Sequence, residues 1–177
     1  EIAKDENKNS FVRMYAVEAI GAMEKPETVY VLIKLYETTD PNLRTSIIKG
    51  LAHYPNDKEA VQVIIESIRD SHYKVRLESI SAIKEMKLAD AIPYVLYRAK
   101  KDPESSVKYA CYTVLGELNS KEGEEYLASI LTDKKQGDTS KIKASEVLIK
   151  YGDSSSVNKV IELAKSTFTF LLFIRQN

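Results

Sequence analysis

The 177-residue chain has a single cysteine, two histidines and no tryptophan. One cysteine excludes an internal disulfide. With only two histidines beside it, the chain also has too few ligands of the kind that structural zinc sites use. His53 and His72 are each followed by a tyrosine and fall near expected loops, so we expect both at the surface. The sequence therefore predicts no metal and no other cofactor.

An excess of charge of one sign is also missing, because 26 basic and 26 acidic side chains leave a net charge of zero. Such a chain has no overall field to attract nucleic acid or an anionic membrane surface. No run reaches the ~18–20 apolar residues that a membrane-spanning helix needs. We therefore expect no nucleic-acid binding and no membrane span. The chain opens at Glu1 with no methionine and no signal-peptide pattern, which leaves the compartment open, with the cytoplasm favoured.

The chain does contain an internal repeat. A basic residue recurs in the same local pattern at positions 13, 44, 76, 108 and 141, so successive copies are 31, 32, 32 and 33 residues apart. Five copies in one register do not arise by chance, and periods of this length indicate a repeat architecture. We place the repeats at about 9–39, 40–69, 70–101, 102–133 and 134–166.

Each repeat reads as two short amphipathic helices. In the unit 70–102, the first run has apolar or small residues on one helical stripe, and the second run has another stripe over about three turns. Neither stripe is wide enough to make a core alone, whereas stacked copies bury both. The predicted fold is an all-α solenoid of about five antiparallel helix pairs. The two stripes are Val75, Ser79, Ala82, Ile83 and Met86, then Ile92, Val95, Leu96 and Ala99.

Three segments, V-R-L-E-S-I-S-A-I, A-I-P-Y-V-L and K-Y-A-C-Y-T-V-L-G-E-L, resemble HEAT repeats in the short form also found in phycobilisome-lyase-type proteins. The resemblance implies that the second helices line a concave face. It also implies that the recurring basic residue pairs with an aspartate of a neighbouring repeat, and we expect Asp40, Asp70, Asp102 and Asp133 to serve. Cys111 lies on the buried stripe of the fourth first helix, where a thiol acts as a small apolar group.

The function that we favour is a non-catalytic scaffold that binds a protein or an extended peptide on the concave face. Known catalytic motifs, such as G-x-S-x-G or H-E-x-x-H, are absent, so we expect no enzymatic activity. The alternative that the resemblance leaves open is an enzyme or enzyme subunit of the phycobilisome-lyase type, handling a bilin-like ligand.

Residues of the second helices that do not belong to the buried stripes predict the binding surface. Tyrosine and arginine are enriched at interface hot spots, and the central repeat carries Tyr94, Tyr97 and Arg98 together. A simpler interpretation is that tyrosine, with 11 copies against 4 phenylalanines, fills half-exposed positions throughout the chain. The predicted protein-binding residues are Lys34, Leu35, Tyr94, Tyr97, Arg98, Tyr126 and Ile130.

The most apolar run, Phe168–Ile174, lies where a solenoid needs a polar cap. We treat 167–177 as an apolar C-terminal tail or cap, separate from the repeat array of 1–166. We expect it to fold back over the last repeat. The alternative is a docking tail, through which the chain would bind another subunit or a second copy of itself.

Overall fold

A computed structural model describes the backbone of residues 2–176 and the side chains of residues 2–166. Within those residues it contains ten α-helices, two short 3-10 helices, η1 (Ile2–Lys4) and η2 (Ala89–Ala91), and no strand. The first helices of the five pairs are α1 (Ser10–Gly21), α3 (Pro41–Leu51), α5 (Tyr73–Glu85), α7 (Ser105–Glu117) and α9 (Asp138–Tyr151). The second helices are α2 (Pro26–Leu35), α4 (Lys58–Ser67), α6 (Ile92–Lys101), α8 (Lys121–Thr132) and α10 (Ser154–Gln176).

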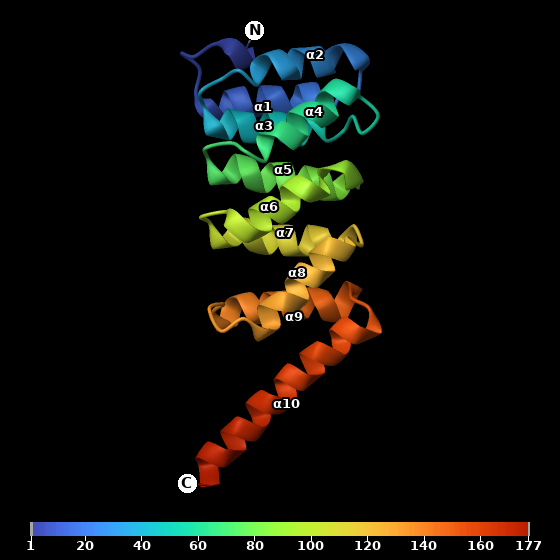
Figure 1. Ribbon diagram of the computed structural model, residues 1–177. Coiled ribbons are helices and arrows are strands. Elements are labelled where there is room, and N and C mark those ends of the chain that lie inside the picture. The colour runs from blue at the N-terminus through green and yellow to red at the C-terminus, as the bar shows by residue number, and fades with distance from the viewer. Residues whose placement is uncertain (1, 177) are drawn as a thin grey trace.

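The pairs stack into a solenoid, as predicted. Figure 1 shows the first helices lying one above the next, with α2 above α1 at the N-terminal end and α4, α6 and α8 running obliquely to the stack. We call the layer of second helices the B-helix face. The first helices pack closely along the whole stack, whereas α4 and α6 make few contacts with each other. The stack of first helices therefore holds the molecule together, and the B-helix face is the more open side.

Local sequence chemistry sets where the helices begin. The Asp40 carboxylate accepts hydrogen bonds from the backbone N–H groups of Asn42 and Leu43, at 2.9 and 3.4 Å, and Pro41 follows in the first turn. The Asp57 carboxylate accepts one from Ala60, at 2.9 Å. These are N-caps, which satisfy donors that the first turn of a helix leaves unpaired.

The core follows the repeat register. We number repeat positions from the recurring basic residue, so that +3 is the third residue after it. At +3 the structure buries Ile47, Ser79, Cys111 and Ala144 completely, which confirms the predicted burial of Cys111. Glycine permits the closest approach in the stack, since a Cβ added to Gly21 of α1 would lie only 2.6 Å from the Gly50 Cα of α3.

The predicted pairing of arginine with aspartate is confirmed at two steps of the ladder. Arg44 donates to both carboxylate oxygens of Asp70, at 2.8 and 3.0 Å, and Arg76 does the same to Asp102, at 2.8 and 2.7 Å. In each pair, two N–H donors of the planar guanidinium match the two oxygens of the carboxylate. Each arginine also donates from Nη1 to a backbone carbonyl just before its own helix, that of Thr38 or Asp70, at 3.0 Å.

At the other steps the pairing is different, and there the prediction is wrong. Arg13 donates from Nε to the Ala3 carbonyl at 3.1 Å, and the Asp40 carboxylate accepts from the Ser10 hydroxyl at 3.2 Å. Among the described residues, neither Lys108 nor Lys141 forms an ion pair. A lysine lacks the two-donor fork that makes the arginine pair directional.

The last helix, α10, runs as one element from Ser154–Gln176 and extends beyond α9 in Figure 1. It passes through residues 166 and 167, where the sequence analysis ended the repeat array. The predicted packing of Phe168–Ile174 on the fifth repeat lies outside the described side chains. None of the helices searched within the described residues has the length and apolar character needed to cross a membrane.

Candidate functional site

A groove opens on the B-helix face where α4 and α6 separate. It contains an open cavity of about 530 Å³, within the size range of small-molecule and peptide sites. The end of α4 forms one side and the first two turns of α6 form the other. The lining residues are Ile68, Arg69, Pro93, Tyr94, Tyr97 and Arg98.

Two tyrosines give the groove its aromatic surface. Tyr94 is 37% exposed and Tyr97 is 61% exposed. The Arg69 guanidinium lies 5.0 Å from the Tyr94 ring centroid, and that of Arg98 lies 5.9 Å from the Tyr97 centroid. Cation–π contacts of this length restrict the arginines and hold the rings against charged groups. The groove therefore presents aromatic faces beside positive charge.

Arg98 is the most constrained residue of the groove, and its side chain is 17% exposed. Its Nε donates to the Ile68 carbonyl at 2.7 Å, which caps the C-terminal end of α4. Its Nη1 lies 3.5 Å from the Asp102 carboxylate, one turn later on the chain. Asp102 is already the bidentate partner of Arg76, and its Oδ1 also accepts from the Glu104 N–H at 3.0 Å. One buried carboxylate thus serves two arginines.

Two of the predicted binding residues are buried in the structure, and the repeat register explains why. Leu35 and Ile130 occupy repeat position +22, the position of Arg98, and they are only 6% and 1% exposed. The side chain at +22 points toward the preceding repeat, as the hydrogen bond from Arg98 to the Ile68 carbonyl shows. An aliphatic side chain there is part of the core.

Lys34 and Tyr126 also lie away from the groove. Lys34 is exposed, with its Nζ 4.4 Å from the Tyr30 ring centroid on the same helix. Tyr126 is half-buried, donates its hydroxyl to the Ala99 carbonyl at 3.1 Å and packs edge-on against Tyr112. Of the seven predicted residues, the structure brings Tyr94, Tyr97 and Arg98 together.

Arg69, Pro93 and Ile68 line the groove, although none of them was predicted as a binding residue. Pro93 lies in the first turn of α6, whereas Ile68 and Arg69 follow the last turn of α4. The signal that could have found Arg69 was a basic residue just before the closing aspartate of the repeat, Asp70. Such a residue reaches the space in front of the next second helix.

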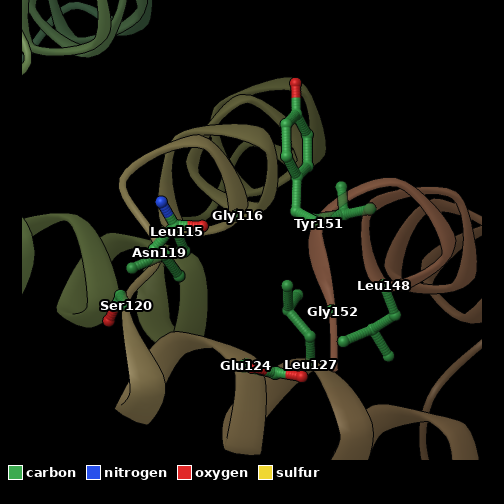
Figure 2. Close-up of a pocket in the computed structure, with 10 residues that line it drawn as sticks. Leu115, Gly116, Asn119, Ser120, Glu124, Leu127, Leu148, Tyr151 and Gly152 are labelled. Carbon is green, nitrogen blue, oxygen red and sulfur yellow. The ribbon is translucent and has the colours of Figure 1, made fainter. Parts of the chain in front are cut away.

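Two other cavities are weaker candidates. Figure 2 shows the smaller one, where Leu115 and Gly116 of α7 face Tyr151 and Leu148 of α9. Its volume is about 50 Å³, room for one or two waters at most. Glu124 at its edge accepts from the Asp153 N–H at 2.7 Å, so this carboxylate fastens the turn between α9 and α10.

The larger one, about 940 Å³ and wide open, lies between α8 and α10. Its charged lining residues are Lys159 and Glu162, which have opposite signs. Its lining ends at Ser166, the last residue with a described side chain. The groove between α4 and α6 combines charge of one sign with aromatic rings, so it is the stronger candidate.

Within residues 2–166, the side chains form no cluster suited to metal binding or to thiol chemistry. No cluster of three or more His, Cys, Asp or Glu there could hold a metal ion. His53 is exposed and lies 3.4 Å from Glu24, and the His72 ring accepts the N–H of Lys74 at the start of α5. Cys111 is fully buried, and burial raises the pKa of its thiol.

A stack of antiparallel helix pairs, joined by arginine–aspartate pairs between repeats, defines the protein as an α-solenoid of the HEAT type. The chain matches the family model of the spirochaete HEAT repeat proteins over residues 1–169, and it belongs to that family. No curated protein matches it in sequence.

Two solved structures share the fold. One is the complex of CpcE and CpcF of phycocyanin lyase from Nostoc sp. PCC7120, with a TM-score of 0.53 and 18% identity, covering 93% of this chain and 79% of that one. The other is a crystal structure of an engineered protein, with a TM-score of 0.52 and 16% identity, covering 90% and 82%. At these identities the likeness shows the fold alone.

Proposed function

We propose that this protein is a non-catalytic scaffold that binds a protein or an extended peptide in the groove between α4 and α6. The observation that carries the proposal is the gathering of Tyr94, Tyr97 and two arginines around one open cavity on the B-helix face. Exposed tyrosines beside arginine are the side chains most often found at interface hot spots. The stacked first helices supply the rigid support that such a surface needs.

The cavity favours binding over the lyase alternative. An acid converging on a deep apolar pocket would favour a lyase. The lining residues include no carboxylate, and the cavity is open along one side. Asp102, the nearest acid to Arg98, is fully buried behind it and bonded to Arg76. It is therefore not placed to exchange a proton with a ligand in the groove.

The test is a Tyr94→Ala/Tyr97→Ala double variant, used as bait beside the wild-type protein in lysate of the native host. Partners retained only by the wild type are identified and their affinities measured. Loss of a true hot spot weakens binding by about 2 kcal/mol or more, roughly thirtyfold. Circular dichroism and urea unfolding must show that the variant is folded.

Tyr30→Ala is the matched control, because Tyr30 is an exposed tyrosine on α2 that lies outside the groove. It should leave the partner set and the affinities unchanged. If the double variant binds every partner as tightly as the wild type does, the groove is not the binding site.

A further inference from the structure

The charge inside the groove is unbalanced. Two of its six lining residues are arginines and none is acidic. Arg69 is exposed, and the described residues give its guanidinium no ion pair, only the contact with the Tyr94 ring. The guanidinium has five N–H donors, and no hydrogen bond to the described residues uses any of them.

Arg98 adds a second charge that the protein only partly neutralises. The Asp102 carboxylate is held by Arg76 at 2.7 and 2.8 Å, and Arg98 approaches it only at 3.5 Å. Two guanidinium groups facing one carboxylate leave one positive charge in excess. The Nε of Arg98 donates to the Ile68 carbonyl, and its Nη1 faces the Asp102 carboxylate. The Nη2 group is therefore left to bind a ligand.

The repeat register shows that Arg98 is a departure from the pattern. Of the other four residues at +22, three are aliphatic and one is acidic: Leu35, Ile130, Leu163 and Glu66. Arg98 stands where other repeats bury an aliphatic side chain. Its positive charge is partly balanced by the Asp102 carboxylate. Departures of this kind from local rules are expected at functional sites.

Resting on the proposed function, we infer that the partner enters this groove with a carboxylate, as an acidic peptide segment whose Asp or Glu side chain sits between Arg69 and Arg98. The rings of Tyr94 and Tyr97 then pack against the residues that flank the acid. Arginine binds carboxylates through paired N–H donors, so both affinity and orientation come from the same contact.

A carboxylate fits this groove better than a phosphate. Arg69 presents its whole guanidinium but Arg98 has only Nη2 without a partner, and so few donors suit the two oxygens of a carboxylate better than the three of a phosphate group. Pro93 in the first turn of α6 also removes one of the N–H donors that a phosphate-binding helix N-terminus would offer.

The experiment is a selection from a random 12-residue phage-display library on the immobilised full chain. The Tyr94→Ala/Tyr97→Ala variant removes peptides that bind elsewhere. Peptides that need the tyrosines should be enriched in Asp and Glu. The best of them, made with a fluorescent label, should lose about tenfold or more in affinity when its acid is changed to the amide.

Arg69→Gln is the protein-side test, since this exposed side chain has no structural hydrogen bond to lose. It should lower the affinity for the selected peptide about tenfold, and Arg69→Lys should recover only part of that loss. Lys74→Gln, an exposed cation on α5 outside the groove, is the matched control and should change nothing. Raising the salt concentration should weaken the wild-type complex more than the Arg69→Gln complex.

The possible results separate the two proposals. Neutral or basic peptides that still depend on the tyrosines would overturn the acidic partner and leave the binding groove standing. Tighter binding when phosphoserine replaces the acid would also overturn it, in favour of phosphate. If every selected peptide binds the double tyrosine variant equally well, the groove itself fails as a binding site.

Discussion

Arg76 and Asp102 are 26 residues apart in sequence and form two parallel hydrogen bonds, at 2.8 and 2.7 Å, with side chains that are 5% and 0% exposed. Arg76 belongs to α5 of one repeat, and Asp102 follows α6 and opens the next repeat just before α7. The bond therefore joins two turns of the solenoid. Because Arg98 shares the same carboxylate, it also ties the candidate binding groove to the stack.

Removing the carboxylate should be costly. Asp102→Asn leaves the buried Arg76 without its counter-charge, and breaking one partner of a buried pair costs about 3–5 kcal/mol. Asp133→Asn is the matched control, because Asp133 closes the next repeat but is exposed and forms no ion pair with any of the described side chains. It should change the free energy of unfolding by no more than about 0.5 kcal/mol. Urea unfolding measures both, and similar values for the two variants would contradict this account.

The pair between Arg44 and Asp70 makes stability depend on pH. Burial alone would raise the pKa of Asp70, but hydrogen bonds from Arg44 and from the His72 N–H outweigh it and hold the pKa below its ordinary 3.8. A carboxyl with a lowered folded pKa stabilises the protein above the unfolded pKa, and this contribution is lost as pH falls through the folded pKa. Asp70→Asn should therefore be less stable than the wild type at pH 7. The difference should shrink below pH 3.8.

Glu78 on α5 should behave in the opposite way. Burial raises the pKa of its carboxyl above the ordinary 4.5, and Glu85 adds to this effect while Lys49 opposes it. Above the folded pKa, the charge of Glu78 therefore lowers the free energy of unfolding. Below the unfolded pKa the carboxyl is protonated in both states, and this effect disappears. Glu78→Gln should gain stability at pH 7 and none below pH 4.5. Urea unfolding at a series of pH values compares both variants, and a gain that persists in acid would contradict the assignment.

Cys111 should be inert to thiol reagents. It is fully buried at +3, and its raised pKa keeps the thiol protonated. The native protein should react with a disulfide reagent far more slowly than the urea-unfolded protein. Cys111→Ala should cost about 1 kcal/mol through the small cavity left behind. Equal rates of labelling in the two states would show that the thiol is accessible.

The fold was largely predictable because the repeat presents the same pattern five times. The period, the helix pairs and the buried stripe with Cys111 follow from the register of apolar and charged positions. The aspartate partners of Arg44 and Arg76 were implied by the resemblance to HEAT repeats. Arg13 was not predictable in this way. Its Nε bonds the Ala3 carbonyl of η1, a contact that no other repeat has.

The site was only partly predictable, since a helical stripe tells which residues face the core of their own pair but not what a neighbouring repeat covers. Leu35 and Ile130 lie off the stripe and are nevertheless buried, because +22 points toward the adjoining structure. Arg69 belongs to the groove through the spacing of α4 and α6. That spacing depends on how whole repeats pack.

The turn after α5 offers a stabilising substitution that follows from the backbone alone. Lys87 has a φ of 54°, in the left-handed region, and the next N–H, of Leu88, donates to the Ile83 carbonyl at 3.0 Å. This is the helix-ending motif that usually carries glycine, because a Cβ is strained at positive φ. Asn119, at the same repeat position, has a φ of 51° and the same bond from Ser120 to Leu115.

Lys87→Gly should raise the free energy of unfolding by about 0.5–1 kcal/mol, since the relief of strain exceeds the added flexibility of the unfolded chain. Lys84→Gly, three residues earlier and inside α5, should lower it by about 1 kcal/mol, because glycine there only weakens the helix. Asn119→Gly should gain less than Lys87→Gly, since asparagine tolerates the left-handed region. Urea unfolding ranks the three variants. A loss of stability in Lys87→Gly would mean that its side chain contributes more than its backbone costs.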